Sequence, residues 1–303
     1  MAENSNDSTP PLIGWPQLKQ LIFDLRNANE AGQPLTVLWE SFVSAARASE
    51  AQPPEHLGLI LAILREVQQG RQRDEIVILD HGCGGGLTLL YLFAIGYRGI
   101  YGVDTGGHCE DWNRFLAAEC RITEPRFWCY DGLTLPLDNN SVDLIFSQQV
   151  LEHVQPQLLK PYYGEEARVL KPGGLAYHQV PHRLVPYDSH SRTWLIHYLP
   201  RLLRRPFYRL SGNDSRYIES ILWLRWPWCH RKEITRAIGN CEDRTVERLV
   251  GITNLDDYEK ENRGLRRFIG MLVRLPLLGR MAGWLLRNFV MLDTVSFKPA
   301  RTS

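Results

Sequence analysis

The sequence predicts a doubly wound α/β fold with a mostly parallel sheet. Short apolar segments alternate with helix-compatible segments from Ile76 to about Val180, and such alternation is typical of parallel strands joined by right-handed crossovers. Polar side chains follow four of these strands, at Asp80, Asp104, Asp131 and Ser147. A ligand crevice in such a sheet lies at the carboxyl ends of its strands, so we expect the four residues to share one site.

Before this alternation we expect a disordered polar tail followed by helices. Residues 1–11 have neither a basic start nor an apolar core, and therefore no secretory signal is predicted. Residues 18–25 and 36–46 are predicted to form short helices. The segment 54–69 predicts a longer one, because Pro54 suits a first turn and Gly70 a stop. Its apolar stripe consists of Leu57, Ile60, Leu61 and Leu64.

Composition narrows the class of protein. The chain has 303 residues, 44% of them hydrophobic, which is enough for one large domain or a domain with additions. The formal net charge is +1, so the chain lacks the excess of positive charge that nucleic-acid-binding proteins usually carry. The six cysteines show no C-x-x-C pair and no metal-ligand spacing, which indicates reduced thiols in an intracellular protein. No metal site is predicted.

The most informative stretch is 76–86. Ile76–Leu79 predicts a buried strand that ends at Asp80, and Gly82, Gly84 and Gly86 then lead into an apolar helix over 87–95. A strand that turns on glycines into a helix offers bare backbone and free N–H groups to a ligand. The dinucleotide spacing G-x-G-x-x-G would require a glycine at 87, where Leu87 stands. This departure disfavours a nicotinamide-dependent oxidoreductase.

The pattern Asp80-x-Gly82-x-Gly84-x-Gly86 instead resembles the first motif of the class I S-adenosylmethionine-dependent methyltransferases. Further segments resemble later motifs of that family in order. They are Ile100–Asp104, Tyr130–Asp131–Gly132 with Leu135–Pro136, Val142–Ser147 with Val150–Val154, and Ala167–Gly174. The resemblance covers about residues 74–181 and implies a Rossmann-like sheet of seven strands, mostly parallel with an antiparallel last strand, plus helical additions.

The resemblance also implies roles for single residues, with S-adenosyl-L-methionine as the cofactor. The three motif glycines would contact the methionine part, and Asp80 would orient the loop or bind the ammonium group. Asp104, 22 residues after Gly82, would accept hydrogen bonds from both ribose hydroxyls. Asp131 would accept one from the adenine amino group, in the segment that includes Gly132. Ser147 would line the mouth of the site.

Residues for proton transfer are expected after the fifth strand, which is predicted over 175–180. A hydroxyl acceptor must lose its proton, and a neutral histidine suits that task near pH 7. His182 follows the strand, and Asp188 and His190 lie two residues apart on the next loop. We predict these three as the catalytic group, with hydrogen bonding within the loop as the alternative. His178 is interpreted as a core residue, and His153 as one that holds the loop after the fourth strand.

Beyond residue 181 the pattern is less regular. Helices are predicted over 216–224 and 231–238, the sixth strand over 242–250, and the antiparallel last strand over 290–298. The predicted organisation is therefore a tail with helices in 1–50, a cofactor-binding core in 51–181, and an acceptor or lid region in 182–303. The last region includes an insertion, 251–289, that the minimal fold does not need.

The insertion is basic and amphipathic. Residues 262–292 contain six arginines and no acid, and Leu278, Met281, Leu285 and Phe289 fall opposite Arg280 and Arg287 on a helical wheel. We predict two short helices separated at Pro276. Contact with an anionic membrane surface through 262–289 is one hypothesis, assisted by the cationic segment 201–205 with Arg209. Packing on the core or on a second subunit is the other.

These patterns predict an enzyme that methylates a small or lipid-linked molecule, with oxygen favoured over nitrogen or carbon. The alternative is a catalytically silent protein that keeps the cofactor fold as a scaffold or partner subunit. We expect a cytoplasmic protein, peripheral to the membrane if the insertion binds lipid, and no nucleic-acid partner. Acceptor identity and oligomeric state do not follow from the sequence, because fold does not determine substrate.

Overall fold

The computed structural model describes residues 15–51, 53–106, 109–188, 191–212, 222–250, 270–271 and 273–300. The predicted tail 1–11, residue His190, and the parts of the predicted helices within 213–221 and 262–269 lie outside these ranges. The described helices are α1 (Trp15–Glu30), α2 (Thr36–Ala48), α3 (Glu55–Gln68), α4 (Leu87–Ala94), α5 (Cys109–Cys120), α6 (Leu159–Val169), α7 (Arg201–Leu210), α9 (Pro227–Ala237), α10 (Thr245–Val250) and α12 (Pro276–Phe289).

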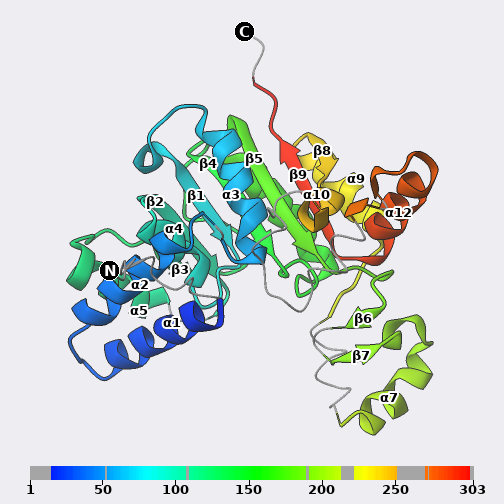
Figure 1. The fold of residues 1–303 in the computed structure, drawn as a ribbon, viewed down its shortest axis with the longest axis horizontal. Helices are drawn as coiled ribbons and strands as arrows, with labels where there is room; N and C mark the ends of the chain where they lie inside the picture. The colour runs from blue at the N-terminus through cyan, green and yellow to red at the C-terminus, as the bar shows by residue number, and fades with distance from the viewer. Residues whose placement is uncertain are drawn as a thin grey trace, which may run out of the picture.

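A central sheet of seven strands organises the described chain (Figure 1). The strands are β1 (Val77–His81), β2 (Gly99–Asp104), β3 (Phe127–Cys129), β4 (Val142–Gln148), β5 (Leu170–Val180), β8 (Asn240–Asp243) and β9 (Leu292–Phe297). Their order is β3-β2-β1-β4-β5-β9-β8. Strands β1 to β5 pair in parallel, and β9 is antiparallel to both β5 and β8. The predicted mostly parallel sheet with an antiparallel last strand is confirmed.

Both faces of the sheet are covered by apolar cores. On one face, Ile78 and Ile100 pack with helices α1 to α5, and on the other, Leu79 and Val103 pack with α6 and α9. Successive residues of a strand point to opposite faces, which is why a continuous apolar run suits a strand buried on both sides. The predicted stripe of α3 is buried, with Leu57, Ile60 and Leu64 each 0% exposed. Burial of each such side chain stabilises the fold by about 1.5–3 kcal/mol.

The predicted sixth strand over 242–250 is wrong from residue 244 onward. The strand β8 ends at Asp243, and residues 245–250 form α10. The side chain of Asp243 explains this change, because its Oδ1 accepts a hydrogen bond from the backbone N–H of Thr245 (3.0 Å) and so satisfies a donor at the start of the helix. The hydroxyl of Thr245 in turn accepts from the N–H of Asp293 and ties α10 to β9.

A second, smaller unit follows β5. It contains the strands β6 (Tyr187–Asp188) and β7 (Thr193–Trp194), a 3₁₀ helix at Ile196–Tyr198, and α7. Figure 1 shows this unit below the edge of the sheet at which β5 ends, while α1, α2 and α5 lie at the opposite end beside β2 and β3. The edge between the two groups is the edge where the carboxyl ends of the parallel strands lie.

Candidate functional site

The loop between β1 and α4 has a backbone that requires glycine. Gly82 has a φ of +99°, and a Cβ added there would lie 2.3 Å from Cγ2 of Val150. Gly84 has a φ of +48°, and an added Cβ there or on Gly85 would meet no atom within 4 Å. The first glycine therefore permits close packing against the turn after β4, and the loop surface at Gly84 and Gly85 faces open space.

A hollow of about 530 Å³ lies beside this loop. Gly85, Leu87 and Trp112 line it together with residues of α1. The indole N–H of Trp112 donates to the carbonyl of Gly85 (3.0 Å) and holds the loop in this conformation. The helix α1 therefore contributes a wall to the crevice in addition to covering the core.

Two predicted carboxylates meet at the loop. Asp104, at the end of β2, accepts hydrogen bonds from the N–H of Gly84 (2.8 Å) and the N–H of Gly106 (3.1 Å) through different oxygens. Each carboxylate oxygen has a second lone pair and can accept another bond. Asp80 is buried, and its pKa is raised by burial and by repulsion from Asp104. Asp80 and Asp104 therefore lie on the neighbouring strands β1 and β2, and each raises the energetic cost of charging the other.

The remaining predicted cofactor residues lie at neighbouring strand ends in two different environments. Asp131 is exposed, and its pKa is lowered because the backbone N–H groups of Leu133 and Thr134 donate to its Oδ1. Gly132, with a φ of +77°, completes this turn. Ser147 is 1% exposed, and its hydroxyl lies 2.8 Å from that of Tyr162. The side chain of Ser147 therefore lies within the core in this structure rather than at the mouth of the crevice.

A buried polar network beneath the crevice was missed by the sequence analysis. Glu166 of α6 is 0% exposed and lies 2.9 Å from Nδ1 of His81 and 2.8 Å from Nε2 of His178. Burial alone would raise the pKa of Glu166, but His178 and His81 outweigh that effect and hold it at about 2. His81 also contacts the hydroxyl of Tyr130 (2.6 Å), beside the predicted adenine segment. The neighbouring polar residues Asp80 and His81 are the sequence signal for this network. Successive residues of a strand point to opposite faces, so His81 must find its polar partners on the face away from Asp80.

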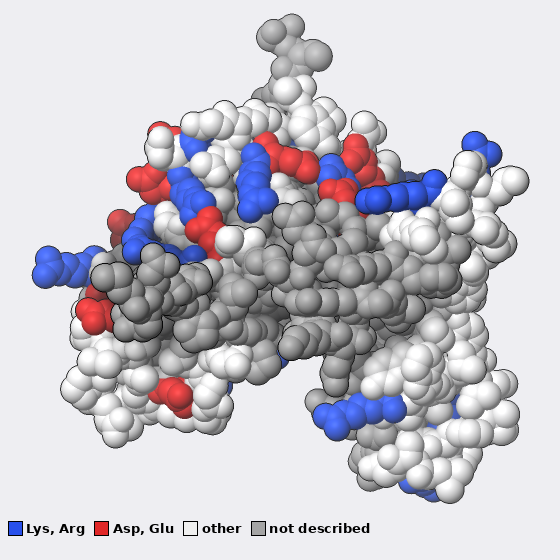
Figure 2. Space-filling view, viewed as in Figure 1, with Lys and Arg blue, Asp and Glu red and all other residues white. Residues whose placement is uncertain are grey.

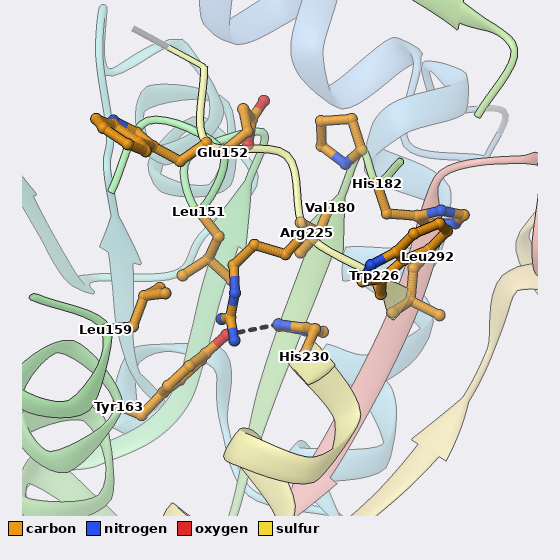
Figure 3. A pocket seen from close by; sticks show the side chains of 12 residues that line it. Leu151, Glu152, Leu159, Tyr163, Val180, His182, Arg225, Trp226, His230 and Leu292 are labelled. Atoms are coloured by element: carbon orange, nitrogen blue, oxygen red, sulfur yellow. Dashed lines mark hydrogen bonds between the residues drawn. The ribbon is translucent and has the colours of Figure 1, made fainter. Parts of the chain in front are cut away.

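His182 does not have the environment that we predicted. Figure 3 shows it among the residues around a cavity, with Tyr163 and His230 joined by a hydrogen bond nearby. The cavity measures about 10 Å³, so it can hold at most one water molecule. Nε2 of His182 donates to the carbonyl of Val290 (2.9 Å), and Nδ1 accepts from the N–H of Leu184 (3.3 Å). Both nitrogens are occupied, and burial lowers the pKa to about 4, so the expectation that His182 acts as the base is corrected.

Asp188 and His182 line different cavities, so the structure does not bring these two members of the predicted catalytic group together. Asp188 is 6% exposed and accepts a hydrogen bond from the hydroxyl of Ser191 (2.5 Å) at the wall of a larger cleft. The histidine on that wall is His197, whose Nε2 donates to the carbonyl of Val185. Burial lowers the pKa of His197, and the bond to Val185 and the charge of Asp188 only partly oppose this effect. His190, the third predicted catalytic residue, lies outside the described residues.

No group of three or more His, Cys, Asp or Glu side chains within the described ranges has the geometry to hold a metal ion. Likewise, none of the described helices is long and apolar enough to span a membrane.

The strand order, the glycine loop and the carboxylates at its rim can now be compared with known proteins. Residues 79–178 match a family model described as a methyltransferase domain. Residues 79–178 thus carry a methyltransferase domain. This methyltransferase domain extends from β1 to β5 and contains the loop, Asp80 and Asp104, as the resemblance implies.

Among curated proteins, an uncharacterized methyltransferase of Mycobacteroides abscessus is 46% identical over 81 residues. The match covers 25% of this chain and 29% of that protein, so the chain spans under a third of the length of this curated relative.

Two solved structures are similar to this chain at low sequence identity. One is a complex of the Haloferax volcanii Trm112 methyltransferase activator with a methyltransferase, at 18% identity, a TM-score of 0.42, and coverage of 86% of this chain and 97% of that chain. The other is geranyl diphosphate C-methyltransferase from Streptomyces coelicolor, at 14% identity, a TM-score of 0.44, and coverage of 84% and 81%. Likeness of this degree concerns the fold alone.

Proposed function

We propose that the whole chain transfers the methyl group of S-adenosylmethionine to an oxygen of a small or lipid-linked molecule. The observation that carries this proposal is the arrangement of an open glycine loop with Asp80 and Asp104 at the carboxyl edge of β1 and β2. The sulfonium and ammonium groups of the cofactor are cations. The repulsion between two neighbouring carboxylates is relieved by a bound cation, which supports a positively charged ligand at this site.

Each residue at the loop has a separate task in this proposal. The glycine backbone would hold the methionine part, Asp104 the ribose hydroxyls, and Asp131 with Gly132 the adenine. When bound, the cofactor supplies a methyl group on a positively charged sulfur, and the transfer depends mostly on the alignment of acceptor and donor with water excluded. The helix α1 and the unit after β5 would exclude water from two sides of the crevice.

A proton-accepting group is needed if the acceptor is a hydroxyl. Three residues are predicted for this role. Among those that the structure describes, Asp188 lines a cleft large enough for a substrate. We propose Asp188 as this group. Its replacement, Asp188→Asn, is expected to lower kcat by about 10²–10⁴-fold, and a loss below about threefold would leave alignment alone to carry the reaction. Cofactor affinity, measured by calorimetry, should stay unchanged in this variant.

The activity can be tested with methyl-labelled cofactor and a cell extract separated into aqueous and organic-soluble fractions. We expect label in an organic-soluble product in the presence of the protein, and an O-methyl group when that product is analysed by mass spectrometry. The Asp104→Ala variant should transfer little label. Binding of the cofactor without any transfer would support the alternative, a catalytically silent scaffold or partner subunit.

We further propose peripheral contact with an anionic membrane through 262–289, a segment that includes α12. Its buried residues are Gly279 and Gly283, while Leu277 is 81% exposed and Trp284 59% exposed. An amphipathic helix on a protein core normally shows the reverse arrangement. Neither α12 nor α7 contains an acidic residue, which favours an anionic lipid surface over a protein partner of mixed charge.

Flotation with vesicles of phosphatidylcholine and phosphatidylglycerol tests this contact. We expect the intact protein to float with the vesicles and the double variant Leu277→Glu, Trp284→Glu to remain below. Vesicles of phosphatidylcholine alone serve as the control for charge. Equal flotation of both proteins, or a stable dimer by light scattering that the double variant abolishes, would contradict membrane contact and favour a second copy of the chain.

A further inference from the structure

Three of the six cysteines lie together beside the glycine loop. Cys83 belongs to that loop, Cys109 begins α5, and Cys129 ends β3. All three are free thiols in the structure. No motif in the sequence links them, so the fold alone brings this thiol cluster together. The cluster has no part in the proposed transfer of a methyl group.

The packing of α5 on β3 sets the positions of Cys109 and Cys129. Asn113 lies one helical turn after Cys109, and its side chain bonds both the carbonyl (2.7 Å) and the N–H (3.0 Å) of Phe127. Residues i and i+4 share one face of a helix, and residues i and i+2 share one face of a strand. Cys109 therefore faces β3 together with Asn113. Cys129 lies on the same face of β3 as Phe127, which packs with α5.

The three sulfur atoms form a hydrogen-bonded chain. The thiols of Cys83 and Cys129 each donate to the sulfur of Cys109. The sulfur of Cys83 also packs on β2, because a Cβ added to Gly102 would lie 2.9 Å from it. Cys83 and Cys109 are buried in one apolar core, whereas Cys129 is exposed. The thiol cluster therefore extends from the loop to the surface.

Cys109, in the middle of the chain of thiols, is the most acidic of the three. The hydrogen bond from Cys83 lowers the pKa of Cys109 to about 7, and burial opposes this effect only in part. The pKa values of Cys83 and Cys129 are raised, chiefly because each donates to Cys109. Near pH 7 a large fraction of Cys109 is therefore thiolate, the form that attacks a disulfide. A buried thiolate beside an exposed thiol can close a disulfide once the exposed partner has reacted.

We propose that Cys109 and Cys129 form a reversible disulfide beside the glycine loop, with a small-molecule disulfide as the oxidant. The thiol of Cys129 loses its proton to solvent and attacks one sulfur of the oxidant, which leaves a mixed disulfide and expels one thiolate. The Cys109 thiolate then attacks the sulfur of Cys129 and expels the second. Each expelled thiolate takes up a proton. Two protein thiols are thus oxidised to one disulfide, the oxidant is reduced to two thiols, and an added thiol reverses both steps.

The disulfide changes the surroundings of Asp104. This residue is the register partner of Cys129 on the neighbouring strand, and its carbonyl accepts from the N–H of Tyr130 (2.9 Å). A disulfide holds its sulfur atoms at about 2 Å, which is shorter than the hydrogen-bonded contact that it replaces. It draws the end of β3 toward α5 and removes the charged acceptor of Cys83 in the loop. The disulfide therefore displaces Asp104 and the loop and weakens cofactor binding. This consequence rests on the proposed function, whereas disulfide formation does not.

The surface at this end of the molecule permits the approach of a charged oxidant. On the face seen in Figure 2, the end that contains α1, α2 and α5 carries charges of both signs among uncharged residues. That face therefore has no patch of negative charge that would repel an anionic disulfide. Glutathione disulfide is accordingly a suitable probe.

Treatment of the full-length protein with glutathione disulfide, followed by mass spectrometry of the intact chain and of its peptides, tests the site. We expect the unaltered protein to lose two hydrogen atoms and to yield a cross-linked peptide pair that contains Cys109 and Cys129. Cys109→Ser should retain one glutathione on Cys129, because nothing displaces it, and Cys129→Ser should form neither product at this site. Cys120→Ser is the matched control, since Cys120 lies at the other end of α5, and it should behave as the unaltered protein does. Dithiothreitol should reverse each product.

Calorimetry with S-adenosylmethionine measures the effect on the cofactor site. We expect the oxidised protein to bind at least about fivefold more weakly than the reduced protein, which is the lower end of typical coupling between two sites. Dithiothreitol should restore the affinity. Cys129→Ser, treated in the same way, should bind the cofactor with unchanged affinity.

Three results would overturn the inference. These are the absence of the cross-linked peptide pair, a Cys109→Ser variant that takes up no glutathione at Cys129, and a disulfide that leaves the affinity for the cofactor unchanged. Cofactor binding by the reduced protein without formation of the disulfide overturns only this inference. A disulfide in a protein that binds no cofactor when reduced overturns the proposed function, and with it the effect on the cofactor site.

Discussion

The two ends of the described molecule differ in the burial of the apolar side chains on their helices. In the cofactor half, α3 buries its stripe, and α4 buries every residue from Leu89 to Ala94. After β5, α7 and α12 instead expose their leucines, with Leu202 at 87% and Leu277 at 81%. The cofactor half buries its apolar side chains against its own sheet and helices. The region after β5 contributes β8 and β9 to the same sheet but leaves apolar side chains of α7 and α12 exposed.

The largest expected effect tests whether the cofactor half is stabilised by its buried polar network. Glu166→Ala leaves His81 and His178 without their shared carboxylate and should lower the free energy of unfolding by about 3–5 kcal/mol. Glu165→Ala is the control, because Glu165 pairs with Arg168 near the surface and should contribute about 1 kcal/mol or less. Urea denaturation at pH 7 measures both, and equal losses would contradict the account.

The same carboxylate predicts a response to acid. The pKa of Glu166 is lowered from 4.5 to about 2, so its stabilising contribution is present above pH 4.5 and is lost as the pH falls toward 2. We expect the stability of the unaltered protein to fall across this window. The Glu166→Gln variant should show a shallower fall, and parallel curves for the two proteins would contradict this assignment.

The glycine loop should show the next largest effect. In Gly82→Ala, the alanine must adopt the positive φ of this position, and its methyl group would lie 2.3 Å from Val150. We therefore expect the free energy of unfolding to fall by about 2–4 kcal/mol. Gly85→Ala is matched to it, since Gly85 has no positive φ and open space around an added Cβ, and stability should change by less than about 1 kcal/mol. Thermal melting of both variants distinguishes a strained loop from a tolerant one.

The smallest effect is expected at His182, and its size distinguishes a structural histidine from a catalytic one. His182→Gln should leave kcat within about threefold, whereas loss of a general base costs about 10²–10⁴-fold. Its stability cost should depend on pH. The pKa is lowered from 6.5 to about 4, so the contribution of neutral His182 is full above pH 6.5 and declines as the pH falls to 4. A hundredfold loss of kcat would restore His182 as the base.

The parts of the fold that could be predicted from sequence are those in which local pattern and tertiary packing agree. The strand Val77–His81, the loop glycines and the stripe of α3 each carry a periodic or steric signal within about fifteen residues. The last strand could also be predicted, because its apolar run is followed by Pro299.

Other features depend on contacts between residues far apart in the chain. The cationic segment 201–205 with Arg209 stands out in the sequence, but the pattern does not indicate that Tyr208 and Arg204 of α7 face the protein. Glu166 is separated by 85 positions from His81, and no local spacing links them. His182 follows β5 as a catalytic residue would, and only the carbonyl of Val290 shows that the ring is already bonded.

The central claim is that the loop at Gly82–Gly86, with Asp80 and Asp104, binds S-adenosylmethionine. Isothermal titration of the full chain with this compound tests it most directly. We predict saturable heat release from the unaltered protein and an affinity lowered by about 10–100-fold in Asp104→Ala, because hydrogen bonds to a charged group are lost. The absence of heat release from the unaltered protein, together with no shift in its Tm, would contradict the claim.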